Sequence, residues 1–261
     1  MIDQLHYLLA AFSGIAVGFT LGLVGGGGSI LAVPLMVYVV GVKSPHIAIG
    51  TSALAVAVNA MAGLLSHARA GNVNWRCGSA FAVAGVIGAL AGSSLGKAFD
   101  GQKLLFLFAL LMVVVGVQMY RGRTDEGVKG VVCNRENLPT VLPYGFGTGA
   151  LSGFFGIGGG FLIVPALVRS TAMPVYRAIG TSLVAVSAFG VTTALNYAVS
   201  GMLDWPLAGV FIAGGIVGSV GGTAASRRLS ARKGQLNTVF AALILIVATY
   251  MLYKSGLILF A

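Results

Sequence analysis

The feature that most constrains the fold is a glycine-rich apolar segment that occurs twice. Residues 22–34, GLVGGGGSILAVP, recur as residues 153–165, GFFGIGGGFLIVP. Each segment lies within an apolar run long enough to enter a lipid bilayer. Consecutive glycines interrupt a helix, because each costs up to about 1 kcal/mol relative to alanine. We therefore predict a helix broken at membrane depth once in each half, a pattern that points to the binding site of a transporter.

The composition supports a membrane location. The chain is 57% hydrophobic and only 8% charged, whereas a soluble domain has about 25% charged residues. Such a chain cannot cover its surface with solvated side chains. The formal net charge of +10 is explained by basic residues that flank apolar spans. No nucleic-acid-binding module is present in the sequence, so the lipid bilayer is the expected partner.

The two halves of the chain are related beyond the glycine segments. Residues 48–52, AIGTS, recur unchanged as residues 178–182, and the Gly71–Trp75 spacing recurs as Gly201–Trp205. Self-similarity at a fixed offset of about 130 positions indicates a duplicated unit.

Charges and turn residues divide each half into five apolar stretches. Stretches of roughly 20 residues cross the hydrocarbon, whereas the second stretch of each half, at about 11–14 residues, is a half-helix. Because five is odd, the two halves must have opposite orientations. We predict an all-α polytopic membrane protein of about ten segments. It consists of two inverted repeats, residues 1–120 and 138–261, each with three to four full spans plus a broken half-helix, joined by a linker at 121–137. The predicted stretches are 5–24, 29–42, 46–66, 77–97 and 103–120, then 139–157, 160–170, 177–199, 205–226 and 235–254.

Charged residues predict the orientation and the driving force. One set of loops carries twelve of the lysines and arginines and the other set four. The positive-inside rule makes the richer set cytoplasmic, so that the linker is cytoplasmic and both termini are outside. The six acidic residues fall in loops or at helix ends, so no mid-span carboxylate is expected for ion coupling. A membrane potential, inside negative, supplies about 2.3 kcal/mol per charge per 100 mV for moving an anion outward, which favours export.

Backbone N–H groups at the glycine breaks are the predicted binding groups. Where each half-helix restarts, its first N–H groups have no intrahelical acceptor, and the positive end of the helix dipole favours an anion. Hydroxyl groups on the next helix, and two amide side chains within apolar spans, can complete the coordination. Each group also has a structural alternative. The glycines can allow helices to pack closely, the hydroxyls can bond to a backbone carbonyl one turn back, and the amides can form hydrogen bonds between helices. The candidate substrate-binding residues are Gly25, Gly26, Gly27, Gly28, Ser29, Thr51, Ser52, Asn59, Gly156, Gly158, Gly159, Gly160, Thr181, Ser182 and Asn196.

The residues required for catalysis or cofactor binding are not found together in the sequence. The three histidines lie near predicted span ends and the carboxylates lie in loops, so no nucleophile–base pair or metal cluster is expected at membrane depth. Cys77 and Cys133 have neither a disulfide-framework spacing nor a zinc-site spacing and are predicted to be free thiols. We expect a protein without cofactor, metal or enzymatic activity.

The repeated motifs resemble those of the TauE/SafE family of sulfite and organosulfur-anion exporters. The resemblance rests on segments 22–34 and 153–165, on the two Gly-Thr-Ser motifs at 50–52 and 180–182, and on the two Gly–Trp pairs. It implies a multi-pass permease of the bacterial inner membrane that exports sulfite, sulfoacetate or a related sulfonate. A passive anion channel and an importer of an organosulfur compound remain alternatives. The exact anion, the coupling ion and the oligomeric state are open.

Overall fold

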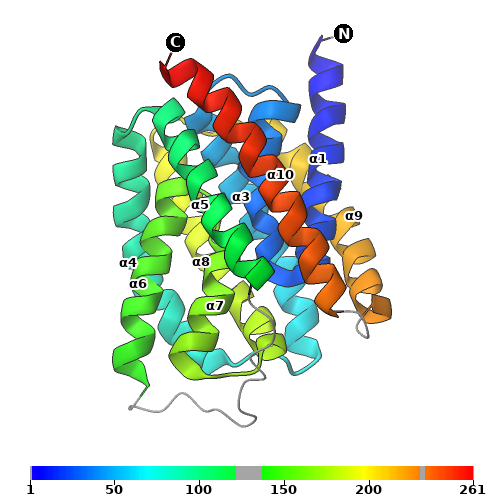
Figure 1. The fold of residues 1–261 in the computed structure, drawn as a ribbon, viewed down its shortest axis with the longest axis vertical. Coiled ribbons are helices and arrows are strands. Elements are labelled where there is room, and N and C mark those ends of the chain that lie inside the picture. The colour runs from blue at the N-terminus through cyan, green and yellow to red at the C-terminus, as the bar shows by residue number, and fades with distance from the viewer. Residues whose placement is uncertain (1, 122–136, 230–232, 261) are drawn as a thin grey trace.

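The computed structural model describes residues 2–121, 137–229 and 233–260, and every regular element within these ranges is helical (Figure 1). Seven of its helices are long and apolar enough to cross a membrane, which confirms the all-α polytopic prediction. These seven are α1 (Ile2–Val24), α3 (Pro45–Arg69), α4 (Trp75–Ala98), α5 (Gly101–Arg121), α8 (Val175–Val199), α9 (Trp205–Leu229) and α10 (Lys233–Phe260). An eighth long helix, α6 (Leu138–Phe155), has 18 residues.

Two shorter apolar helical stretches occupy the predicted half-helix positions. The first half-helix, residues 25–39, consists of η1 (Gly25–Leu31), α2 (Ala32–Pro34) and η2 (Leu35–Val39). The second half-helix is α7 (Gly160–Thr171). Neither is long enough to cross the hydrocarbon comfortably.

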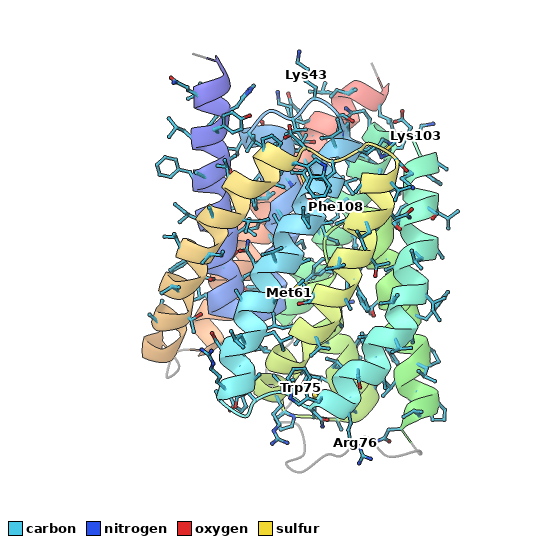
Figure 2. All side chains as sticks on the ribbon, turned by 180° about the vertical axis from the view of Figure 1, so that it is seen from behind. Lys43, Met61, Trp75, Arg76, Lys103 and Phe108 are labelled. Carbon is cyan, nitrogen blue, oxygen red and sulfur yellow. The ribbon has the colours of Figure 1, made fainter. Side chains whose placement is uncertain are left out.

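Both chain ends lie at the same end of the molecule, here called the terminal face (Figure 1). Lys43 and Lys103 lie at this face, whereas Trp75 and Arg76 lie at the opposite face (Figure 2). Helix α5 begins near Lys103 and runs toward the opposite face, and α6, the first helix of the second half, begins at that opposite face (Figure 1). The predicted linker falls almost wholly outside the described residues, which omit 122–136.

Glycines at intervals of four residues hold two helix pairs in backbone contact. A Cβ atom placed on Gly18 of α1 would lie 1.9 Å from the Gly215 carbonyl oxygen of α9, and one on Gly92 of α4 would lie 2.0 Å from the Ala150 carbonyl oxygen of α6. Only glycine permits this approach, which is how helices commonly associate in lipid. The glycines that line these contacts are Gly14, Gly18, Gly22, Gly214, Gly218 and Gly222 for α1–α9, and Gly88, Gly92, Gly145, Gly149 and Gly153 for α4–α6.

Helices α3 and α8 pack antiparallel against each other in the interior. Gly50 near the start of α3 lies against Tyr197 near the end of α8, and Gly63 further along α3 lies against Leu183 further back on α8. Residues 48–53, 55–57, 59 and 60 of α3 are all buried, so this helix pair forms the centre on which the glycine segments pack.

Two sequence predictions need correction. The first glycine cluster is not an unwound break, because Gly25 to Leu31 form a tight 3₁₀ helix directly after α1. Glycine tolerates this narrower helix with its i→i+3 bonds. Cys77, fully buried near the start of α4, is disulfide-bonded and not a free thiol, because sequence separation does not determine spatial distance. Cys133 lies outside the described residues.

Candidate functional site

The second glycine break, residues 156–159 between α6 and α7, is an interruption of regular helix. Gly156, Gly158 and Gly159 have φ values of +67°, +64° and +66°. These left-handed conformations cost an L-residue roughly 1–2 kcal/mol each. Gly156 is the C-cap residue of α6 and Gly159 is the N-cap residue of α7, so the glycines here determine the backbone path as the sequence predicts.

Four consecutive backbone N–H groups at this break donate no hydrogen bond of standard geometry among the described residues, although residues 158 and 159 form a turn that starts at Ile157. The N–H groups of Gly156 and Ile157 donate to the Ser152 carbonyl at 2.8 and 3.3 Å, and those of Leu162 and Ile163 donate to the Gly159 carbonyl at 2.9 and 3.0 Å. The intervening N–H groups, from residues 158 to 161, appear in none of the backbone or side-chain bonds of that part of the chain. They lie at the positive end of the α7 dipole.

Ser152, one turn before the break, adds an uncommitted hydroxyl. Its side chain is fully buried and its Oγ atom has no hydrogen-bond partner. A Cβ atom placed on Gly159 would lie 2.8 Å from this Oγ, so the hydroxyl is adjacent to the free N–H groups. An unpaired buried hydroxyl is costly, which makes Ser152 a ligand-binding candidate.

Sequence reasoning did not select Ser152. Aligning the two glycine segments places it opposite Leu21, so the repeat gives no matching signal. Its only sequence signal is its position four residues before Gly156. The mismatch makes the two glycine segments chemically different, since Gly28, the counterpart of Gly159, packs on Thr20 and Leu21 instead.

Side chains of the central helix pair, α3 and α8, line the break. A Cβ atom on Gly158 would lie 2.8 Å from Val56 Cγ1 of α3 and 3.3 Å from Val186 Cγ1 of α8. Val56 and Val186 occupy equivalent positions in the two halves. The break is therefore enclosed by protein in the interior and not exposed to lipid, as unpaired backbone at membrane depth requires.

Asn59 lies one turn beyond Val56 on α3. It is 2% exposed, and neither its Nδ2 nor its Oδ1 atom has a hydrogen-bond partner. It packs against Gly215 of α9, where a Cβ atom would lie 2.0 Å from Nδ2. Its counterpart in the other half, Phe189, is a fully buried apolar ring. A buried amide with both polar atoms unpaired is the second side chain of this region that is suited to a polar guest.

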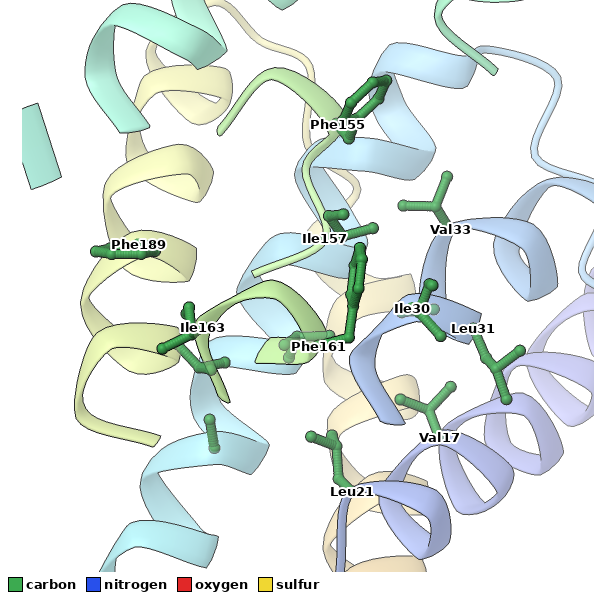
Figure 3. Close-up of a cluster of buried hydrophobic side chains, with 14 of the residues drawn as sticks. Val17, Leu21, Ile30, Leu31, Val33, Phe155, Ile157, Phe161, Ile163 and Phe189 are labelled. Atoms are coloured by element: carbon green, nitrogen blue, oxygen red, sulfur yellow. The ribbon is translucent and has the colours of Figure 1, made fainter. Parts of the chain in front are cut away.

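The first glycine cluster contributes differently from the second. Gly25, Gly26, Gly27 and Gly28 are wound into η1 with Ser29, which is fully buried. η1 contacts both α7 and α8, so the two half-helices do approach each other. Apolar side chains fill the space between them, as Figure 3 shows for Ile30, Ile157 and Phe161, which are 0%, 0% and 4% exposed.

The two motif threonines are not brought together. Thr51 Oγ1 accepts a hydrogen bond from the Asp204 N–H at 3.1 Å, and Thr181 Oγ1 accepts one from the Asn74 N–H at 3.0 Å. Thr181 follows Gly180, which packs against His67 of α3. Thr51 and His67 are sixteen residues apart, or roughly 24 Å at 1.5 Å per residue. One small anion cannot contact both hydroxyls, and each instead holds the loop that precedes a helix of the other half.

The motif serines bond within their own helices. Ser52 Oγ donates to the Ile49 carbonyl at 3.0 Å, and Ser182 Oγ donates to the Ile179 carbonyl at 2.8 Å. This is the one-turn-back arrangement considered above as the structural alternative.

Asn196 is also remote from the break. It lies ten residues after Val186 on α8, which is roughly 15 Å along the helix. Its Oδ1 atom accepts a hydrogen bond from Lys97 Nζ at 2.8 Å. It belongs to a separate polar cluster near the terminal face.

The described carboxylates lie at helix starts. Asp100 Oδ1 accepts from the N–H groups of Gln102 and Lys103, and Asp204 Oδ1 accepts from the N–H of Leu207. Asp125, Glu126 and Glu136 lie outside the described residues. Within residues 2–121, 137–229 and 233–260, no group of three His, Cys, Asp or Glu side chains could hold a metal ion.

Comparison with known proteins places the chain in a transporter group. The family model described as "Sulfite exporter TauE/SafE" matches residues 10–251. A probable membrane transporter protein of Xylella fastidiosa (strain Temecula1) is 53% identical over 93% of this chain and 94% of its own length. The probable membrane transporter protein YunE of Bacillus subtilis is 24% identical over 87% of this chain and 91% of its own. No solved structure matches the chain.

Proposed function

Because the chain belongs to the sulfite exporter TauE/SafE family, we propose that it exports a small sulfur-containing oxyanion, bound at the second glycine break. The chain is a multi-pass membrane transporter and not an enzyme. Sulfite, sulfoacetate and related sulfonates are the proposed substrates. The proposed location is the bacterial inner membrane, with both termini outside.

One observation carries the proposal, which is the row of four unpaired N–H groups beside the unpaired Ser152 hydroxyl. Sulfite and sulfonates present three oxygen atoms on one sulfur, each able to accept more than one hydrogen bond. Backbone donors at a helix N-terminus suit such a group. Asn59 Nδ2, in the neighbouring turn of α3, is available as a further donor.

The neutrality of the site supports transport over permanent binding. The side chains that contact the glycines of the break are Ser152 and the apolar Ile49, Val56, Ile163 and Val186, and the neutral amide of Asn59 lies one turn beyond Val56, against Gly215 of α9. A partly dehydrated anion held by dipoles alone can leave, whereas a fixed buried cation would retain it more strongly. The proposed site is asymmetric between the two halves of the chain. The first glycine cluster is helical, and it has Leu21 at the position where the second cluster has Ser152.

The contact pattern supports two inverted repeats. Helix α1 packs on α9 as α6 packs on α4, and α3 contacts α9 as α8 contacts α4. The opposite directions of α1 and α6 agree with the predicted odd number of segments per half. We propose that alternating access arises from movement between these halves.

The apolar contact between the half-helices supports a carrier over an open channel. Ile30, Ile157 and Phe161 close the centre beside the break, so that an anion has no continuous polar path there. Transport would require these side chains to separate, first toward one face and then toward the other.

Flux in liposomes at imposed potentials tests the proposal. For a monovalent sulfonate such as methanesulfonate, an electrogenic carrier will reach a distribution that changes about tenfold per ~60 mV, since ~2.3 kcal/mol acts per charge per 100 mV and ~1.4 kcal/mol equals a factor of ten. A distribution independent of potential would contradict potential-driven export. Stepwise single-channel currents would identify the channel alternative instead.

A further inference from the structure

A polar cluster near the terminal face contains a lysine without a carboxylate partner among the described residues. Lys97 Nζ, in the last turn of α4, donates to Asn196 Oδ1 at 2.8 Å, to the Asn196 carbonyl at 3.0 Å and to Ser200 Oγ at 2.8 Å. All three acceptors are neutral and lie at the C-terminal end of α8, where Ser200 is the C-cap residue. The ammonium is half-buried, and its charge is solvated by dipoles but not neutralised.

The cluster is organised around the Asn196 amide. Asn196 Nδ2 donates to Ser93 Oγ at 2.6 Å and to Ser94 Oγ at 3.1 Å, which fixes its oxygen toward Lys97. Ser94 and Ser200 are exposed. The positive charge is therefore held in place and can be reached from outside the protein.

Tyr197 provides an independent sign of a missing ligand. Its ring centroid lies 6.0 Å from Lys97 Nζ, and its side chain is fully buried, yet its hydroxyl has no hydrogen-bond partner. That hydroxyl lies 3.3 Å from the position that a Cβ atom on Gly96 would occupy. The Lys97 cation therefore lies beside the ring of Tyr197, and the uncommitted Tyr197 hydroxyl lies beside Gly96, the residue that precedes Lys97 on α4.

We propose that Lys97, Asn196, Ser200 and Tyr197 form a second oxyanion site, separate from the glycine break. It lies roughly 15 Å from the break along α8, near the terminal face. The oxyanion is either a sulfur oxyanion from solution or the phosphate of an anionic phospholipid. Leu95, Leu195 and Val199, which are 61%, 60% and 90% exposed, provide apolar surface for acyl chains next to the lysine. This site does not depend on the proposed transport activity.

Thermal unfolding of purified protein tests this site by binding alone. The parent chain is a Gly158→Leu variant, which removes the glycine-break site, and Lys97→Met, Lys97→Arg and Ser200→Ala are added to it. Lys103→Met is the matched control, because Lys103 is an exposed lysine of the same face. Each variant is titrated in neutral detergent with sodium sulfite, with phosphatidylglycerol and with phosphatidylcholine, at constant ionic strength.

We expect sulfite or phosphatidylglycerol, but not phosphatidylcholine, to raise the unfolding midpoint by about 5–10 °C at ~100-fold excess over Kd. The rise should persist with Lys103→Met and Lys97→Arg, shrink with Ser200→Ala and vanish with Lys97→Met. Which ligand acts identifies the source of the oxyanion. No rise with either ligand, or an equal rise in Lys97→Met, would overturn the proposal. An equal sulfite response with and without Gly158→Leu would count against the glycine-break site and leave this one intact.

Discussion

A leucine at position 158 is expected to abolish transport while the protein still inserts and folds. Gly158 has a φ of +64°, and a Cβ atom there would lie 2.8 Å from Val56 Cγ1. A larger side chain would shift the backbone and fill the space beside the free N–H groups. Losing two hydrogen bonds to a charged group, at about 1.5–3 kcal/mol each, weakens binding by roughly 100-fold or more.

Gly147 provides the matched control for this prediction. It lies within α6, and no atom would be within 4 Å of an added Cβ. Gly147→Ala should leave transport unchanged and stabilise the protein by about 0.5–1 kcal/mol, because alanine loses less entropy in a helix. Sulfite flux in liposomes, normalised to inserted protein, checks both variants. Normal flux in Gly158→Leu would refute the backbone site.

Replacing Asn59 with leucine is expected to raise the stability of the protein and to lower its transport rate. Both amide atoms are buried without partners, and each such group costs about 1–3 kcal/mol. An apolar side chain of similar size should therefore raise the unfolding midpoint, by about 2–4 °C per kcal/mol for a chain of this size. Phe189, its apolar and fully buried counterpart in the other half, indicates that the fold accepts such a residue.

Transport by the Asn59→Leu variant should nevertheless fall by at least about tenfold, which corresponds to one lost hydrogen bond of about 1.4 kcal/mol to the anion. Thermal unfolding and initial flux on the same preparation measure both effects. A more stable variant with unchanged flux would show that Asn59 has only a packing role. A Phe189→Leu variant serves as the control for altered packing at the equivalent position.

The helical spans could be predicted closely because hydropathy and charge determine where a chain can cross a bilayer. The predicted stretch at 160–170 corresponds to α7 at Gly160–Thr171, and the stretch at 205–226 to α9 at Trp205–Leu229. Contacts between helices were harder to foresee. The repeated Gly-Thr-Ser motifs suggested one shared site, but an antiparallel pairing of α3 and α8 places Thr51 and Thr181 near opposite ends.

The two glycine clusters show where sequence similarity stops being informative. Both contain glycines in matching positions, yet one winds into a 3₁₀ helix and the other remains an open turn with three left-handed glycines. Local glycine content permits either outcome, and the packing around each cluster decides. Ser152 was missed for the same reason, since only the fold brings its hydroxyl next to Gly159.

The central claim is that backbone N–H groups at the second glycine break bind the transported anion. Anomalous diffraction from crystals soaked in selenite, a heavier analogue of sulfite, tests it most directly. The account predicts a selenium peak within hydrogen-bonding distance of the N–H groups of residues 158–161 and of Ser152 Oγ. Selenium found only beside Lys97, or absent from the break while transport of selenite is demonstrated, would contradict it.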